Sequence, residues 1–247
     1  MYDWLSYMKL GKPPGAMSIR YNHSQSPHTE EGAAAALPYL LTDSWPKSIL
    51  DVGCGLGTWL KVAIELGITD VYGVDGIKID GKRLLFPESR FTVVDLRKAF
   101  ELNRRFDLVI CLEVAEHLPP TFAEQIIESL VLHGEAILFS AACPNQPGQH
   151  HINCQWPAYW QQLFNLHGYM CDDSIRWRIW SDSRIEPWYR QNMFFASYRP
   201  AAAGSEARLV PVIHPEMMRV MTGLSRHFPP TLAKAARQIR AVFKVDR

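Results

Sequence analysis

The chain has 247 residues, which at about 100–200 residues per domain leaves room for one large domain with an accessory region. Its 47% hydrophobic and 21% charged residues are typical of a chain that buries a core, which excludes global disorder and collagen-like or mucin-like sequences. The net charge of +1 excludes a whole-molecule attraction to nucleic acid or anionic lipid.

The cysteines and the N-terminal sequence indicate the cellular compartment. The five cysteines are odd in number and form no CxxC pair, which argues against a disulfide framework and for reduced thiols. The first residues contain an acid, Asp3, and no apolar stretch of signal-peptide length. No apolar run reaches the roughly 18 residues of a membrane span. We therefore expect a cytoplasmic protein without a transmembrane segment.

Taken in order, the predicted elements alternate between strands and helices. Residues 1–28 are rich in Gly, Pro, Ser and His and are expected to form a flexible N-terminal arm. A helix is expected at 29–41, where Thr29 supplies the cap. Strands are expected at 48–53, 70–75, 91–95, 106–112 and 135–142, with helices at 58–66, 97–103 and 121–132. Apolar strands alternating with helices predict an α/β, doubly wound parallel sheet that is covered on both faces.

The composition changes after residue 142. A polar loop leads to a helix expected at 157–167, and a last strand is expected at 192–199. Residues 200–247 carry eight Lys/Arg and three Asp/Glu, with an amphipathic helix expected at 231–243. The domain interpretation is a 1–28 arm, a 29–200 catalytic domain and a basic 201–247 extension. The extension is expected to dock on protein, either this domain or a homodimer partner, with an anionic membrane surface as the alternative.

The segment SILDVGCGLGTWL is the most informative part of the sequence. A buried strand that includes Asp51 runs into a Gly-x-Gly turn at Gly53 and Gly55, which predicts the first βα unit of a nucleotide-binding sheet. A dinucleotide fingerprint requires glycine where Thr58 stands, which disfavours an NAD-dependent oxidoreductase. Asp75 ends the next predicted strand. Its separation from Asp51 along the sequence is close to that at which an acid in a nucleotide-binding sheet reaches the ribose hydroxyls. Alone, these residues are also compatible with ordinary turn glycines and a solvated aspartate.

Four motifs together resemble a known family. LDVGCGLGTWL, GVDG, VVDL and FDLVICLEVAEHL resemble motifs I to IV of the class I S-adenosylmethionine-dependent methyltransferases, over about residues 45–142. The resemblance implies a Rossmann-like seven-stranded sheet with an antiparallel last strand. GQHHINCQWPAYWQQLF and EPWYRQNMFF are similar to a bacterial subgroup associated with cell-surface sugar or specialised-metabolite pathways.

The same resemblance implies the cofactor-binding residues. The methionine part of S-adenosyl-L-methionine would face Asp51, Gly53 and Gly55, and the ribose would face Asp75; Gly76 is a further expected cofactor-binding residue. The adenine would face Asp95 and Leu96, and the sulfonium region would face Leu112.

Two histidines are candidates for acid–base catalysis. Methyl transfer from a sulfonium requires alignment of donor and acceptor and removal of the acceptor proton, for which histidine is suited near neutral pH. His150 and His151 lie in a loop after the fifth predicted strand, at the ligand-binding edge of the sheet. One of them is the predicted general base; the alternative is a loop histidine that bonds backbone or contacts substrate only.

A second set of residues fits a divalent metal ion. If a helical turn begins at Glu113, its side chain and those of Glu116 and His117 project toward one face, with His150 or His151 as a fourth ligand. An ion there would lower the pKa of an acceptor hydroxyl. A similar Glu-x-x-Glu-His pattern occurs in metal-dependent terminal 2′-O-methyltransferases of small RNAs. The alternative is a capping role at a strand–helix junction.

The acceptor is less constrained by the sequence. Aromatic residues between 156 and 189 are expected mainly to pack the core and partly to line an acceptor pocket. We predict O-methylation of a sugar, a glycan precursor or another small polar acceptor. Arginines interleaved with these aromatic residues leave RNA as the less favoured alternative, because the net-acidic 1–199 region carries no RNA-binding module. A cofactor-binding relative that has lost turnover and serves as an interaction subunit remains the non-enzymatic alternative.

Overall fold

A computed structural model describes residues 21–23, 29–40 and 45–222. Its strands are β1 (Ser48–Val52), β2 (Asp70–Asp75), β3 (Phe91–Val93), β4 (Leu108–Leu112), β5 (Ala136–Ser140), β6 (Tyr169–Asp172) and β7 (Phe194–Tyr198). Its α-helices are α1 (Glu30–Leu40), α2 (Thr58–Glu65), α3 (Ala123–His133), α4 (Pro157–Leu166), α5 (Ser174–Ile179), α6 (Pro187–Asn192) and α7 (Pro215–Thr222). Most of the predicted arm and the helix predicted at 231–243 lie outside the described residues.

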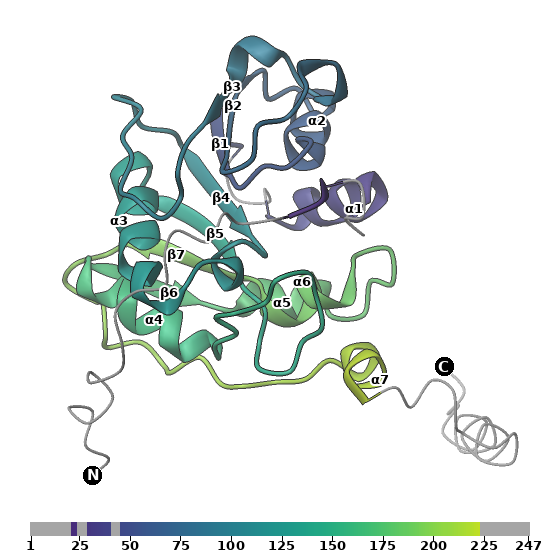
Figure 1. Cartoon of the computed structure of the whole chain (residues 1–247). Coiled ribbons are helices and arrows are strands. Elements are labelled where there is room, and N and C mark those ends of the chain that lie inside the picture. Colours follow the sequence, from purple (N-terminus) through teal and green to yellow (C-terminus); the bar gives the residue numbers. More distant parts are fainter. Residues whose placement is uncertain (1–20, 24–28, 41–44, 223–247) are drawn as a thin grey trace, which may run out of the picture.

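The strands form one seven-stranded sheet in the order β3-β2-β1-β4-β5-β7-β6 (Figure 1). The first five strands pair in parallel, and β7 pairs antiparallel with both β5 and β6. The predicted Rossmann-like fold with an antiparallel last strand is confirmed. After β3 the chain returns to the other side of β1, which makes a topological switch point at the carboxyl ends of β1 and β4.

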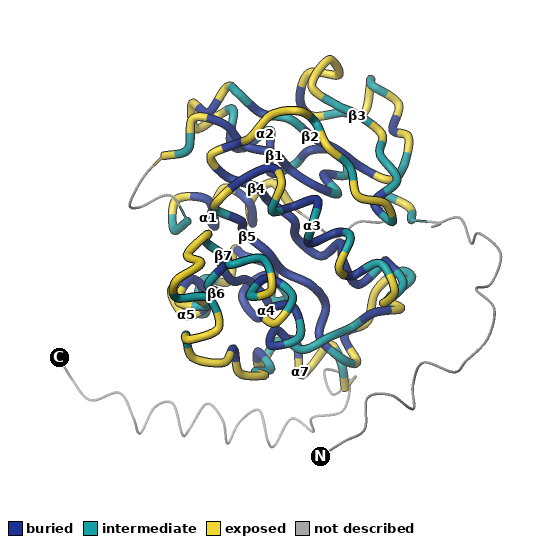
Figure 2. The backbone as a smooth tube through the Cα atoms, turned by 90° about the vertical axis from the view of Figure 1, so that its left-hand side faces the viewer, coloured by how far each residue is buried: buried dark blue, intermediate teal, exposed yellow. Residues whose placement is uncertain are grey.

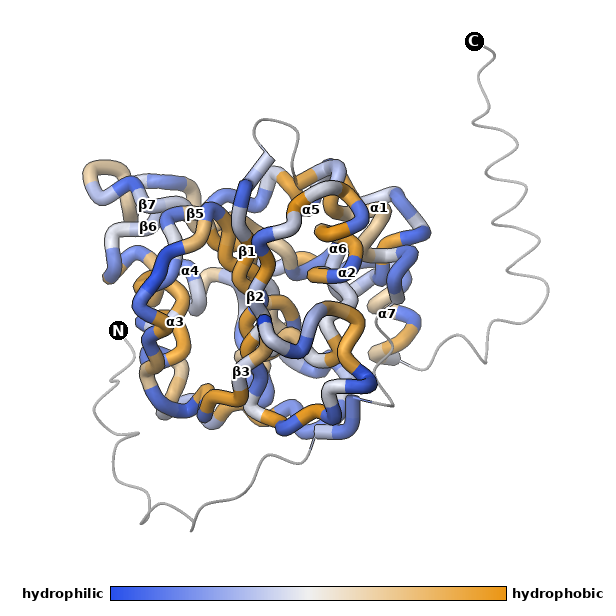
Figure 3. Tube along the Cα trace, turned by 90° about the horizontal axis from the view of Figure 1, so that it is seen from above, coloured by the Kyte–Doolittle hydropathy of each residue, from blue (hydrophilic) through white to orange (hydrophobic). Residues whose placement is uncertain are grey.

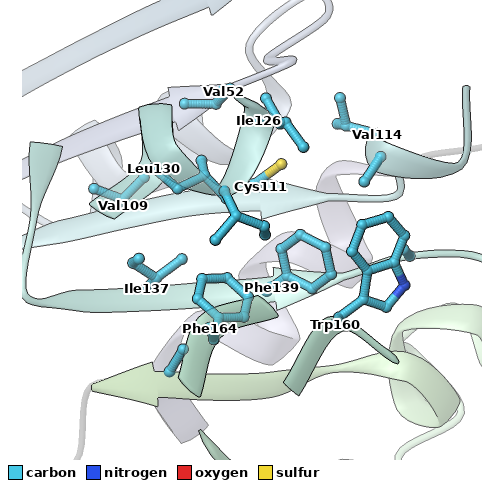
Figure 4. Close-up of a cluster of buried hydrophobic side chains, with 14 of the residues drawn as sticks. Val52, Val109, Cys111, Val114, Ile126, Leu130, Ile137, Phe139, Trp160 and Phe164 are labelled. Atoms are coloured by element: carbon cyan, nitrogen blue, oxygen red, sulfur yellow. The ribbon is translucent and has the colours of Figure 1, made fainter. Parts of the chain in front are cut away.

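Side chains alternate along the central strands between two hydrophobic layers. In β5, Ile137 and Phe139 pack with α3 and α4, whereas Leu138 packs in the opposite layer with α1, α2, α5 and α6. In β4, Cys111 packs in the first of these layers and Ile110 packs in the opposite layer. Figure 3 shows the two groups of helices on opposite sides of the sheet, and Figure 4 shows Phe139 and Cys111 within the first layer.

The start of α1 is fixed by the predicted cap. Thr29 Oγ1 accepts a 2.9 Å hydrogen bond from the backbone N–H of Gly32. Glu186 Oε1 in turn accepts hydrogen bonds from both the N–H and the hydroxyl of Thr29, at 2.7 and 2.8 Å. The first helix is therefore attached to the segment that precedes α6, far along the chain.

The helix predicted at 97–103 is wrong. That segment is a loop, in which two backbone donors bond to side chains of α3: Phe100 N–H donates to Ser129 Oγ at 3.2 Å, and Leu102 N–H to His133 Nε2 at 2.9 Å. The sequence analysis also missed β6 and the short helices α5, α6 and α7. Among the described residues, no helix combines the length and apolar character needed to cross a bilayer.

Figure 2 shows buried backbone concentrated in the central strands and exposed segments at the periphery. Even the residues at the carboxyl ends of the strands are buried: Asp51 is 3% exposed and Asp75 is 4% exposed. Buried carboxyl groups at the ligand-binding edge of a parallel sheet mark the place where the site is to be sought.

Candidate active site

A cavity opens at the carboxyl ends of β1, β2 and β4, the edge at which a doubly wound sheet binds ligands. Its walls combine the glycine turn, the ends of the strands and part of the N-terminal segment. The lining residues are Tyr21, His23, Asp51, Gly53, Cys54, Gly55, Leu56, Thr58, Trp59, Asp75, Gly76, Ile77, Leu96, Leu112, Glu113, Val114, His117, Leu118 and Tyr189.

The glycine turn requires its glycines. Gly53 has φ 78°, in the left-handed region, and a Cβ there would collide with the side chain of Val114. The N–H of Gly53 donates a 2.7 Å hydrogen bond to the carbonyl of Val74, which ties the turn to β2. Glycine at this position therefore lets the turn pack directly against Val114.

Asp75 is held in place by the backbone around it. Its Oδ2 accepts a 2.9 Å hydrogen bond from Gly55 N–H, and its Oδ1 accepts a 2.7 Å hydrogen bond from Ile77 N–H. Each carboxylate oxygen retains a second lone pair for a ligand hydroxyl. A diol is the ligand group that this arrangement fits.

Asp51 lies deeper in the same cavity. Burial, with a further contribution from the nearby charge of Asp75, raises the pKa of Asp51 to about 8. The unliganded group is therefore mainly protonated at neutral pH. A cation placed beside it would favour the ionised form.

The other predicted cofactor residues divide into two groups. Gly76, Leu96 and Leu112 line the cavity. Asp95 is not among the lining residues, because its carboxylate turns to Arg97, whose Nε and Nη2 donate hydrogen bonds of 2.8 and 3.1 Å. That ion pair lowers the pKa of Asp95.

Glu113 directly follows β4 and has an unusual conformation. Its φ of 55° is left-handed, a strained value for a non-glycine residue, and such values cluster at functional sites. Its carboxylate is buried and accepts hydrogen bonds from Gln146 Nε2 at 2.6 Å and from Asn192 Nδ2 at 3.1 Å. The side chain thus fastens β4 to the 141–156 loop and to α6.

Glu116, His117 and His151 come together beside this glutamate. One ligand atom from each lies within 4.8 Å of the others. Glu116 is 0% exposed, and neither of its carboxylate oxygens has a hydrogen-bond partner among the described residues. Burial, together with repulsion from Glu113, raises the pKa of Glu116 well above its ordinary value. Two unsatisfied buried oxygens between two imidazoles are a donor set suited to a divalent cation.

The 141–156 loop reaches this cluster through backbone bonds. The N–H groups of Ile152 and Asn153 both donate to the carbonyl oxygen of Glu116, at 3.0 Å each. Nδ1 of His151 lies 2.9 Å from the carbonyl oxygen of Gln146, so the tautomer that donates there leaves Nε2 free as an acceptor.

Burial lowers the pKa of both imidazoles in the cluster. The pKa of His117 falls to about 4, and that of His151 also falls below its ordinary value. Both rings are therefore neutral at pH 7. His117 lines the cavity, whereas neither His150 nor His151 does. His151 lies behind His117, with 5.1 Å between ring centroids.

Sequence reasoning did not identify Tyr21 and His23 as site residues, because their segment has no regular pattern. The roles of Gln146 and Asn192 were missed as well. Asn192 lies within the EPWYRQNMFF segment and Gln146 shortly before GQHHINCQWPAYWQQLF, so these segments were the available signal. The expected aromatic pocket is represented in the cavity wall by Tyr189, whereas Trp160 and Tyr169 are buried in the core.

The chain matches a known protein family over residues 25–182, more than half of its length, and that family is described as "Methyltransferase domain". The chain belongs to this methyltransferase family. Its predicted membership of the methyltransferases is thereby confirmed, and the predicted S-adenosylmethionine cofactor agrees with it.

Solved structures similar to this methyltransferase include the methyltransferase domain of bacterial CtHen1-C, with 16% identity, a TM-score of 0.52, and coverage of 68% of this chain and 98% of that one. Streptomyces venezuelae DesVI is similar at 15% identity and a TM-score of 0.52, covering 68% of this chain and 91% of its own. At such identities the likeness shows the fold alone. Comparison with curated protein sequences gives no match.

Proposed function

We propose that this methyltransferase transfers a methyl group from S-adenosylmethionine to an oxygen atom of a small polar acceptor. The observation that carries the proposal is the cradle formed by the glycine turn and Asp75 in a chain of the methyltransferase family. When bound, S-adenosylmethionine supplies an electrophilic methyl group on a positively charged sulfur.

The residues around the cavity fit that cofactor. Asp75 has unused lone pairs for the two ribose hydroxyls. Asp51 offers a buried carboxyl group that a nearby cation would ionise, which suits the ammonium and sulfonium charges. Leu96 and Leu112 provide apolar walls for the adenine and the sulfonium region, respectively. Asp95 does not line the cavity, so the adenine contact expected of it stays a prediction.

We propose His151 as the general base, because its Nε2, which lies 3.9 Å from Oε1 of Glu116, is available as an acceptor in a neutral ring whose orientation is fixed by Gln146. His117 separates it from the cavity and offers a second neutral imidazole at the wall. The acceptor hydroxyl would approach between the cavity and the 141–156 loop. His150, the other predicted candidate, contributes its backbone carbonyl near His117 Nδ1, at 3.4 Å.

A second candidate mechanism is favoured by the unsatisfied oxygens of Glu116. A divalent ion held there would lower the pKa of an acceptor hydroxyl. Glu116, His117 and His151 would hold the ion, with Glu113 adjacent but engaged by two amides. Binding of Mn²⁺ measured by calorimetry, lost in Glu116→Gln, would support this mechanism. Full turnover after exhaustive chelation would contradict it.

The class of acceptor rests on the sequence resemblance. The similarity of the 148–164 and 186–195 segments to enzymes of sugar and specialised-metabolite pathways supports a hydroxylated acceptor. A panel of sugars, nucleotide sugars and phenolic metabolites, assayed with labelled S-adenosylmethionine, tests the proposal. Cofactor binding without transfer to any of them would favour an interaction subunit.

The decisive experiment is calorimetry with S-adenosylhomocysteine. Asp75→Ala is expected to weaken binding at least about 10-fold, as loss of hydrogen bonds to a charged group implies. Asp70→Ala is the matched control, because Asp70 begins the same strand and pairs with Arg90 and Arg104 away from the cavity. Equal affinity of both variants would refute the ribose assignment.

A further inference from the structure

Residues 21–23 lie against the cofactor cradle from outside the sheet. Nε2 of His23 lies 3.5 Å from Oδ1 of Asp75. Nδ1 of the same ring lies 3.2 Å from where a Cβ on Gly55 would be, so glycine at this position leaves room for the imidazole. His23 therefore contacts both parts of the cradle, the acid and the turn.

The His23 ring has hydrogen-bonding capacity that the protein does not use. Its Nε2 is buried and has no hydrogen-bond partner among the described residues, although it faces the cavity wall at Asp75. A buried nitrogen without a partner is costly, and a ligand hydroxyl at that point would satisfy it.

Tyr21 connects this histidine to the catalytic side of the cavity. Its ring centroid lies 5.0 Å from that of His23 and 4.8 Å from that of His117. The centroid of the His151 ring lies 5.1 Å from that of His117. Four aromatic rings, those of His23, Tyr21, His117 and His151, therefore form a continuous row from Asp75 to the 141–156 loop. Such packing transmits a displacement at one end to the other, because close-packed rings leave little free volume.

Asn22 joins the same segment directly to that loop. Its backbone N–H donates a 3.1 Å hydrogen bond to Oε1 of Gln149, and its carbonyl accepts a 3.3 Å hydrogen bond from Nε2 of Gln149. The side-chain amide of Gln149 thus pairs with both the N–H and the carbonyl of Asn22, as the backbone of a neighbouring strand would.

We propose that residues 21–23 form the outer wall of the cofactor pocket, in which His23 binds a ribose hydroxyl together with Asp75, and that this wall couples cofactor binding to the position of the 141–156 loop. The inference rests on the proposed function. The Asn22–Gln149 pair and the Tyr21 ring are the two physical connections. Cofactor bound against His23 would hold the wall in place, and the wall would hold the loop that carries His151.

The first arm of the test concerns His23. His23→Phe retains a ring without hydrogen-bonding nitrogens, and His23→Gln restores a polar side chain. Calorimetry with S-adenosylhomocysteine is expected to give a roughly 5- to 10-fold weaker affinity for the Phe variant and partial recovery for the Gln variant. Wild-type affinity in His23→Phe would overturn the inference. Circular dichroism and thermal unfolding establish that both variants are folded.

The second arm concerns the coupling. Hydrogen exchange of residues 144–151 is expected to slow when S-adenosylhomocysteine binds the unaltered chain. Gln149→Ala cuts the hydrogen bonds to Asn22 and leaves the Tyr21 contacts in place, so it is expected to lose part of this protection and, by linkage, to weaken cofactor affinity slightly. Protection that persists in Tyr21→Ala/Gln149→Ala, which lacks both connections, would overturn the coupling. If the unaltered chain fails to bind S-adenosylhomocysteine, the proposed function itself is wrong, which distinguishes the two failures.

Discussion

The backbone N–H of Gly55 donates a 2.9 Å hydrogen bond to Oδ2 of Asp75, so the turn after β1 is bonded to the acid that ends β2. These two parts of the cradle cannot shift independently. The acid is oriented before any ligand arrives, which reduces the entropy that binding must overcome. This bond also gives a physical reason for a glycine turn and a strand-end acid to occur together in the sequence.

Gly53→Ala tests the close approach of the turn to Val114. Gly67→Ala is the matched control, because Gly67 also has positive φ, at 94°, but has no atom within 4 Å of an added Cβ. Both variants bear the conformational cost, and only Gly53→Ala adds the steric overlap. We expect Gly53→Ala to lower the free energy of unfolding by about 1–3 kcal/mol more than the control, as measured by urea denaturation.

The double variant Gly53→Ala/Val114→Ala separates the overlap from other effects. Removing the Val114 methyl groups is expected to recover part of the lost stability. Equal destabilisation by Gly53→Ala and Gly67→Ala would show that the turn is not packed as described.

Cofactor affinity is expected to depend on pH through Asp51. Its pKa of about 8 in the unliganded protein means that binding a cationic ligand at lower pH must release a proton. The titratable groups whose charges interact with it are Asp75, Cys54, Cys111 and Tyr189. Affinity for S-adenosylmethionine should therefore strengthen as pH rises from 6 to 8, by up to about 10-fold per pH unit.

Asp51→Asn is the control for this dependence, because it removes the titrating proton and keeps the shape. Calorimetry in buffers of different ionisation enthalpy measures the proton released at pH 7. Proton release that is the same in Asp51→Asn and in the unaltered chain would assign the linkage to another group.

The cofactor-binding residues could be predicted from the sequence because their positions depend on the order of the strands along the chain. Asp51 lies near the end of β1, Gly53 follows that strand and Asp75 ends β2. The apolar pattern of both strands is plain, so the meeting of these residues at one sheet edge follows from the parallel topology. The side chains of Glu113 and His151 were harder to place, because the left-handed φ of Glu113 turns its carboxylate toward Gln146 and Asn192. Such a backbone conformation leaves no periodic trace in the sequence.

His151→Ala is expected to lower kcat by about 10²- to 10⁴-fold, the usual contribution of a general base. S-adenosylhomocysteine affinity should be unchanged, since His151 is not part of the cavity wall. His150→Ala is the neighbouring control and should retain turnover. Steady-state kinetics with calorimetry on the same preparations measures both quantities. Greater loss in His150→Ala than in His151→Ala would reverse the assignment.

Glu116→Gln addresses the metal alternative through stability. Burial and repulsion from Glu113 raise the pKa of Glu116 and so favour its neutral form, which the amide of Gln matches in size. The free energy of unfolding in chelator should change by no more than about 1 kcal/mol. Added Mn²⁺ should raise the melting temperature of the unaltered chain but not of the variant. An equal rise in both would place the ion elsewhere.

Tertiary contacts hold residues 97–103 as a loop, although the local sequence pattern predicted a helix there, and His133 makes one of these contacts. This side chain is 0% exposed; its Nδ1 lies near the carbonyl oxygen of Ser129, and its Nε2 accepts from the N–H of Leu102. His133→Ala removes the acceptor and leaves that N–H unsatisfied, at a cost of about 1–3 kcal/mol.

His167→Ala is the control for this variant. His167 follows the end of α4, much as His133 ends α3, but its side chain is only half-buried. Urea denaturation should show a larger loss for His133→Ala, and hydrogen exchange should quicken at Leu102 in that variant alone. Unchanged exchange at Leu102 would mean that the loop is held by its other contacts, such as the bond from Phe100 to Ser129.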